Sequence, residues 1–69
     1  MIPEWQARLR DETLELAERL NKLHAFMATQ AFYELPREEK DLLYEQSRLM
    51  NSYVQVLGKR CEIYGIKLK

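Results

Sequence analysis

The sequence is poor in residues that interrupt helices and in residues that cross-link small folds. Its 69 residues include two glycines, two prolines, one cysteine and one histidine. A single cysteine excludes a disulfide within one chain, and Cys61 with His24 is too small a set of soft ligands for a structural zinc. A single domain of this size has a core that seldom provides more than about 3–5 kcal/mol. Assembly with other chains is therefore the remaining source of stability.

Long hydrophobic runs are also missing. No stretch approaches the roughly 20 apolar residues that span a bilayer, and no N-terminal run resembles a signal peptide. A lone cysteine is typical of a reducing compartment. Cys61 lies within an apolar helical pattern, which favours a buried, inert thiol over a reactive one. These features predict a cytoplasmic protein with no membrane partner.

Two long amphipathic segments make up most of the chain. Pro3 and Pro36 suit the first turns of helices, Thr29 is a plausible cap for a short turn, and Gly65 can end the last helix in a left-handed conformation. The sequence predicts helices over about 4–28, 30–34 and 36–64, with Phe32 and Leu35 closing the end of a helical hairpin. The expected fold class is all-α, one domain over 1–69.

Apolar residues repeat every seven positions in both segments, which places them on one stripe of each helix. The first segment has the rows Leu9, Leu16, Leu23 and Thr13, Leu20, Met27. The second has the adjacent rows Leu42, Leu49, Val56, Ile63 and Leu43, Met50, Leu57, Tyr64. Two helices cover only one side of each other, so the broader second stripe predicts a compact homo-oligomer.

The motifs of common enzymes are missing. There is no glycine-rich phosphate loop, no HExxH motif and no inward-facing Glu-x-x-His pair. The carboxylates of the first segment are typical of a solvated face, and His24 has no acidic residue three or four positions before it. We therefore expect a protein without catalytic activity, metal or cofactor.

The charges sum to zero but are unevenly placed. Up to Glu45 the chain has six basic and ten acidic residues, and from Gln46 onward it has five basic residues and one acidic residue, Glu62. This balance argues against a DNA or RNA polymer as partner, because duplex binding requires a cationic face and would show a steep salt dependence. It leaves room for a small anionic ligand.

Four residues have two interpretations each. Trp5 is either an interface aromatic or a stacking surface for a base, with Arg8 available to a phosphate. Lys22 and Arg60 stand among apolar neighbours, so their charges require either carboxylates across an interface or a ligand phosphate. Gly58, inside the last helix, indicates either close packing of another helix or a ligand that reaches the backbone.

The order of these residues resembles the phage anti-CBASS protein 2 family. The resemblance spans about residues 5–64 and rests on the following positions: Trp5-Gln6-x-Arg8-Leu9, Glu12, Leu16, Lys22-Leu23-x-Ala25-Phe26, Phe32, Leu35, Gln46, Met50, Tyr53, Val56-Leu57 and Arg60. It implies a compact helical hexamer that binds cyclic oligonucleotide second messengers of bacterial immunity without cleaving them. Such a sponge would act in the host bacterial cytoplasm and would keep the host effector inactive.

The resemblance also implies ligand contacts. Cyclic dinucleotides such as 3′,3′-cyclic GMP–AMP would lie between protomers, and cyclic trinucleotides would occupy separate pockets. Lys22 matches a phosphate-contacting lysine, Arg60 a late arginine, and Trp5 is the available stacking aromatic. His24 stands where the family often has a small hydroxyl residue, which questions trinucleotide binding. The alternative is a helical module that binds or inhibits another protein through its apolar stripe.

Overall fold

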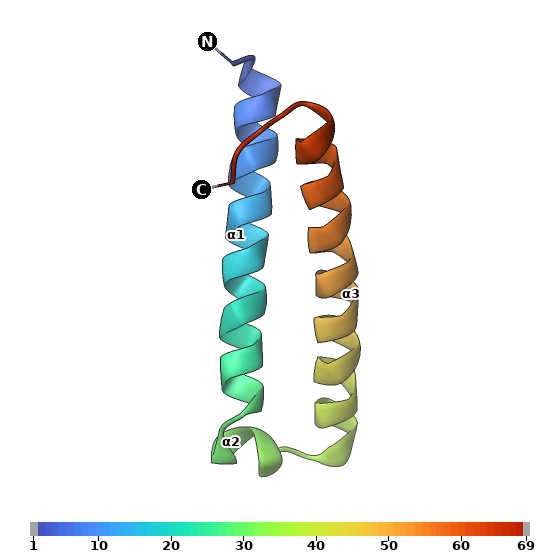
Figure 1. Cartoon of the computed structure of the whole chain (residues 1–69). Helices are drawn as coiled ribbons and strands as arrows, with labels where there is room; N and C mark the ends of the chain where they lie inside the picture. Colours follow the sequence, from blue (N-terminus) through green and yellow to red (C-terminus); the bar gives the residue numbers. More distant parts are fainter. Residues whose placement is uncertain (1, 69) are drawn as a thin grey trace.

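The computed structural model describes residues 2–68, which form a hairpin of two long helices closed by a short one (Figure 1). Helix α1 spans Glu4–Met27, α2 spans Gln30–Tyr33 and α3 spans Arg37–Ile63. The described residues form an elongated body of 48 × 16 × 15 Å. The all-α helical hairpin expected from the sequence is confirmed, and each helix end lies within a residue of its expected position.

The helix ends follow the local chemistry of the sequence. Pro3 and Pro36 are the N-cap residues of α1 and α3, and the Thr29 hydroxyl accepts a hydrogen bond from the Phe32 backbone N–H at 3.3 Å. After α3, Gly65 has a φ of 64°, and the backbone N–H of Ile66 donates to the carbonyl of Cys61 at 2.9 Å. This closing turn satisfies carbonyls at the end of α3 and sends the chain back toward α1 (Figure 1).

The core between α1 and α3 is narrow. Leu9, Leu57 and Cys61 are buried together, and Leu16, Ile66 and Leu68 pack against them. Thr13 is buried as well; its hydroxyl donates to the Leu9 carbonyl at 2.7 Å and lies 3.6 Å from the Cys61 sulfur. The expectation of a buried Cys61 thiol is confirmed.

The closed end of the hairpin is built around one aromatic ring. Phe32 is fully buried and makes edge-to-face contacts with Phe26, Tyr33 and Tyr44, at centroid distances of 6.1, 5.4 and 5.4 Å. Phe32 therefore closes this end as the sequence predicts, and Leu35 is half-buried beside it in the chain.

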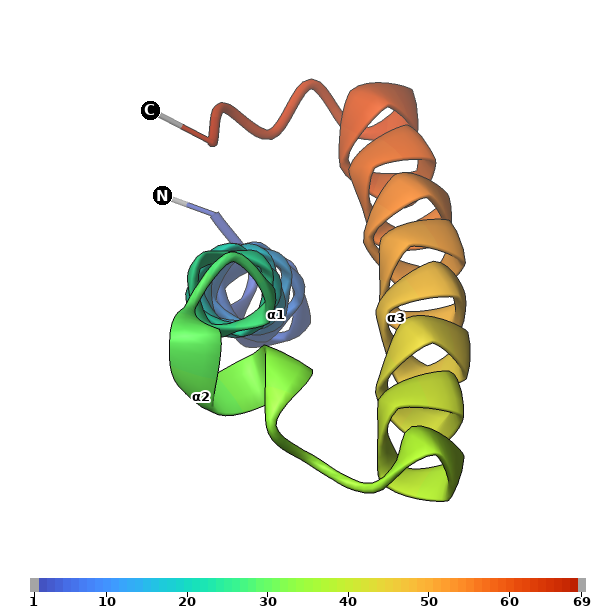
Figure 2. The same cartoon turned by 90° about the horizontal axis from the view of Figure 1, so that it is seen from below.

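Only one of the two apolar rows of α3 faces α1. Leu43, Met50 and Leu57 are half-buried or buried, whereas the other row, which we call the outer row, consists of Leu42, Leu49, Val56 and Ile63 and is 54–75% exposed. Figure 2 looks along α1 and shows α3 inclined to it, so the two helices cover each other over a limited width. No element within residues 2–68 covers the outer row.

Gly58 has open space around it within the described part of the chain. A Cβ built at this position meets no atom within 4 Å in the described part of the chain. No helix within residues 2–68 packs closely at Gly58, so the close packing or ligand contact that the sequence indicates would involve another protomer or a bound ligand.

Candidate functional site

One lateral side of the hairpin gathers most of the predicted ligand-binding residues. We call it the Arg60 face and define it by Trp5, Arg8 and Lys22 of α1 with Tyr53 and Arg60 of α3. Arg8 and Lys22 are fourteen residues apart, about four turns, and so project from the same side of α1. All five side chains belong to exposed residues.

Trp5 is held at the open end of this face by a contact between the two long segments. Its indole lies 4.7 Å from the Tyr64 ring, centroid to centroid, with an interplanar angle of 83°. Trp5 remains 46% exposed and Tyr64 48% exposed. The edge-to-face contact restricts the orientation of the indole while part of its surface stays accessible, which suits stacking on a flat ligand.

The centre of the face joins α1 to α3 through a polar contact. The Tyr53 phenol donates a hydrogen bond to the Glu12 carboxylate. This hydrogen bond and the Glu12 charge raise the pKa of Tyr53, while the nearby positive charge of Arg60 acts in the opposite direction. Arg60 thus lies close enough to Tyr53 to influence it electrostatically.

Arg60 differs from the other cations of the face in its lack of an ionic partner. Within residues 2–68, no carboxylate lies within 4.0 Å of its guanidinium. Arg8 pairs with Glu4 at 2.6 Å, and Lys22 pairs with Glu18 at 3.3 Å. Because an exposed ion pair contributes little, both cations remain available to a stronger anionic partner.

The position of Lys22 corrects an expectation. The sequence places Lys22 between apolar neighbours, but its side chain is 76% exposed. Residues one or two positions apart do not face each other on a helix, so Leu20 and Leu23 turn toward α3 while Lys22 turns outward beside Glu18. Arg60 is likewise exposed within the protomer, although it lies four residues after Val56 of the outer row and so beside it on α3.

His24 lies on the other side of α1. It follows Lys22 by two residues, a rotation of about 200°. Its Nε2 is 2.8 Å from the Ser47 hydroxyl of α3, within hydrogen-bond distance. The structure therefore brings Trp5, Arg8, Tyr53 and Arg60 to one face and places His24 on the opposite one.

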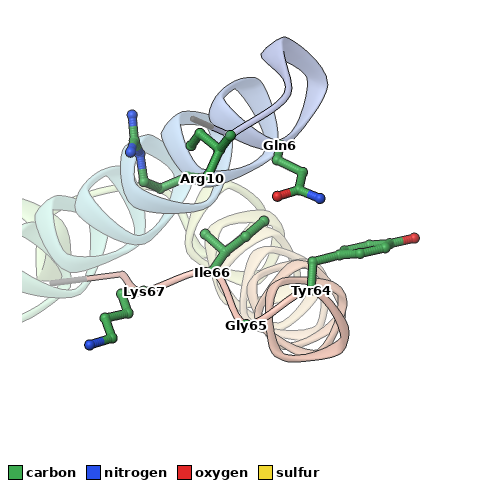
Figure 3. A pocket seen from close by; sticks show the side chains of 7 residues that line it. Gln6, Arg10, Tyr64, Gly65, Ile66 and Lys67 are labelled. Carbon is green, nitrogen blue, oxygen red and sulfur yellow. The ribbon is translucent and has the colours of Figure 1, made fainter.

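A hollow that the sequence did not predict lies at the open end of the hairpin, between α1 and the segment after α3 (Figure 3). It has a volume of about 370 Å³ and is lined by Ile2, Gln6, Arg10, Tyr64, Gly65, Ile66 and Lys67. The only sequence signal was Gly65, whose left-handed turn redirects the chain. The path of the chain after that turn determines the hollow, and periodicity gives no information about it.

No grouping of three or more His, Cys, Asp or Glu side chains in residues 2–68 is suited to hold a metal ion. The helices described here also include none long and apolar enough to cross a membrane. What this protomer offers chemically is a set of exposed cations beside aromatic rings.

Comparison with known proteins gives one family. Neither the curated proteins nor the solved structures include a match. Residues 3–63, nearly the whole chain, match the Sequestin family. The chain therefore belongs to the Sequestin family, which confirms its resemblance to the anti-CBASS sponges and indicates a binding, sequestering role.

Proposed function

We propose that this protein binds cyclic oligonucleotide second messengers and holds them uncleaved, so that the effectors of bacterial CBASS immunity stay inactive. Cyclic dinucleotides such as 3′,3′-cyclic GMP–AMP are the main ligands, and cyclic trinucleotides are further ligands. The observation that carries this proposal is membership of the Sequestin family over residues 3–63. The Arg60 face supplies the matching chemistry.

A cyclic dinucleotide combines two phosphate charges with two flat bases. On the Arg60 face, Arg60 has no carboxylate partner among the described residues, and Arg8 and Lys22 have only exposed ones. Trp5 offers a restricted but accessible ring. Charge-assisted hydrogen bonds to phosphate and stacking on aromatics are the interactions that hold such a ligand.

The spacing of the cations favours a pocket between protomers. The side chains of Thr13 and Cys61 meet across the hairpin, so Arg60 lies near the level of residue 13 of α1. Lys22 is nine residues further along α1, about 14 Å at 1.5 Å per residue. One ring-shaped ligand contacts both most readily if the two residues come from different chains.

The exposed outer row supplies a reason for assembly. Twelve large apolar side chains in residues 2–68 are exposed, against four that are buried. Such a protomer gains more from a homo-oligomer than from its own core. We propose that the outer row packs against other copies, in the hexamer that the resemblance implies.

Trinucleotide binding is assigned to the opposite face. His24 replaces the small hydroxyl residue of the family, but the Ser47 hydroxyl lies 2.8 Å from its Nε2. Ser47 thus restores a hydroxyl next to that position, and the imidazole adds a second donor. We include His24 in the proposed ligand-binding set on this ground.

Sequestration requires slow release and no chemistry, which agrees with the indicated binding role. The proposed setting is a phage protein at work in the cytoplasm of its bacterial host. There it would act by stoichiometry, each pocket removing one messenger.

The decisive experiment is a calorimetric titration of 3′,3′-cyclic GMP–AMP into the protein, with the oligomeric mass measured in the same buffer. We expect tight binding of about one ligand per two chains, as for a pocket between two protomers, and recovery of intact nucleotide after denaturation.

The Lys22→Ala variant should keep the oligomer and lose at least roughly tenfold in affinity for the ligand, the value of one charge-assisted contact. Lys59→Ala, an exposed lysine of α3, is the matched control. A well-folded oligomer that binds neither this ligand nor a cyclic trinucleotide would refute the proposal.

The outer row also supports a second candidate, a module that binds another protein. Its four aliphatic side chains recur once every seven residues along α3 and could contact an amphipathic helix. If the oligomer left this row exposed and no cyclic nucleotide bound, the second candidate would replace the first. A closed oligomer that covers the row would exclude it.

A further inference from the structure

The hollow at the open end has an unusual combination of lining residues. Arg10 and Lys67 contribute two positive charges, Gln6 an amide and Tyr64 a phenol, while Ile2 and Ile66 provide apolar surface. Among the described residues, 2–68, no carboxylate lines the hollow. Figure 3 shows Gln6 and Ile66 facing each other across the hollow, and Arg10 and Lys67 beside it with their charged ends pointing outward in opposite directions.

The hollow is part of the fixed structure of the protomer. The backbone N–H of Gly65 donates to the Glu62 carbonyl at 3.1 Å and that of Ile66 to Cys61 at 2.9 Å, which fixes the turn after α3. Ile66 and Leu68 then pack on the core cluster. Tyr64 is held from its other side by Trp5. The walls are thus set by the turn, the core and an aromatic contact.

Arg10 is less exposed than the cations of the Arg60 face. Its side chain is 39% exposed, compared with 74% for Arg8 and 76% for Lys22. Its Nε lies 3.3 Å from the Asp11 carboxylate, which engages one edge of the guanidinium and leaves its other donors available. Partial burial strengthens a charge-assisted hydrogen bond relative to one in open water.

The charge of the hollow comes from these side chains rather than from helix ends. The start of α1 and the end of α3 meet at this end of the molecule, and their dipoles oppose each other (Figure 1). The negative charge of Asp11 offsets the positive charge of Arg10, and the charge of Lys67 then makes the site positive overall. A small anion joined to a flat apolar group matches the combination of charge, amide and apolar walls, and a volume of about 370 Å³ can hold one.

We propose that this hollow is a second binding site, which takes a nucleoside monophosphate with its base against Ile66 and its phosphate at the side where the long side chains of Arg10 and Lys67 turn inward on binding. Gln6 and Arg10 lie on the side of α1 away from Arg8, so the hollow opens away from the cations of the Arg60 face, and Tyr64 lies between the hollow and Trp5. This site binds one nucleotide within a single protomer, whereas the proposed cyclic dinucleotide pocket is shared between protomers.

The test is calorimetric titration of 5′-AMP, and in parallel of inorganic phosphate, into the full-length protein. We expect AMP to bind and inorganic phosphate to bind at least roughly tenfold more weakly, because only AMP uses the apolar walls. Arg10→Gln and Lys67→Gln should each weaken AMP binding by roughly tenfold. Arg37→Gln removes an equal charge at the far end of the hairpin and should have no effect. Thermal unfolding and oligomeric mass establish that each variant is folded.

Several outcomes would overturn the inference: no AMP binding at millimolar ligand, equal affinity for phosphate and AMP, or equal losses in Arg10→Gln and Arg37→Gln. The cyclic dinucleotide titration separates this inference from the proposed function. The Arg10→Gln variant should bind 3′,3′-cyclic GMP–AMP with the affinity of the wild type. A loss of that affinity would show that the hollow is part of the cyclic dinucleotide site and would overturn the inference of a second site. AMP binding without cyclic dinucleotide binding would support the hollow and refute the sponge.

Discussion

At the scale of single residues, the two glycines of the chain occupy different environments and should respond oppositely to alanine. Gly58 lies inside α3 with open space around a Cβ, whereas Gly65 has a φ of 64°. Gly58→Ala should stabilise the protein by about 1 kcal/mol through helix propensity. Gly65→Ala should destabilise it by about 1–2 kcal/mol, the cost of a left-handed alanine. Thermal unfolding of both variants measures the difference, and destabilisation by Gly58→Ala would show that another protomer packs at that position.

Tyr53 gives the protein a specific response to alkaline pH. The Glu12 hydrogen bond raises the pKa of Tyr53 above 10.0 in the folded state. The unfolded chain therefore loses this proton first, and above pH about 10 stability falls as pH rises through the folded pKa. Below that range the contribution is fully present.

Phenolate absorbance during a pH titration measures this effect, and subtraction of a Tyr53→Phe titration isolates the Tyr53 signal. Glu12→Gln removes the charge but keeps an acceptor, so it should move the Tyr53 midpoint down toward its ordinary value. An unchanged midpoint in Glu12→Gln would show that the contact with Glu12 does not form in solution.

At the scale of elements, α3 shows what periodicity can and cannot predict. The repeats correctly predicted a long amphipathic helix with an apolar surface too broad for one partner. They did not indicate which row faces α1, because Leu42, Leu49 and Val56 are as apolar as Leu43, Met50 and Leu57. That choice depends on the inclination of the helices, which is set by packing between them. Lys22 was misjudged for a related reason, since neighbours in sequence are not neighbours on a helix surface.

The outer row leads to a prediction about assembly. Leu49→Glu places a charge in the middle of the row, where Leu49 is 54% exposed in the protomer, so the single chain tolerates it. If the row packs against other copies, the buried charge should dissociate the oligomer. Asn51→Glu adds the same charge on a different side of α3 and should leave the assembly intact. Light scattering after gel filtration gives both masses, and an unchanged mass for Leu49→Glu would place the interface elsewhere.

At the scale of the whole molecule, the candidate site was predicted residue by residue but not as an arrangement. Trp5, Arg8, Lys22 and Arg60 were selected from neighbouring residues and from the family resemblance. The structure adds that Trp5 contacts Tyr64, that Arg60 lies near Tyr53, and that Arg8 and Lys22 project from the same side of α1. It also separates His24 from them and reveals the hollow beside Arg10. These relations depend on helix rotation and on the path of the chain after Gly65, neither of which the sequence pattern specifies.

The separation of Lys22 from Arg60 along the hairpin allows a direct test of a pocket shared between chains. Lys22→Ala and Arg60→Ala should each lose cyclic dinucleotide binding as a uniform oligomer. In oligomers assembled from a one-to-one mixture of the two variants, some pockets combine an intact Lys22 from one chain with an intact Arg60 from another. If the two variants assort at random, roughly a quarter of all Lys22–Arg60 pairings between chains have both residues intact. Calorimetry of the mixed oligomer should therefore recover a minority of high-affinity sites. A pocket formed within one chain would recover none, because every chain in the mixture lacks one of the two residues.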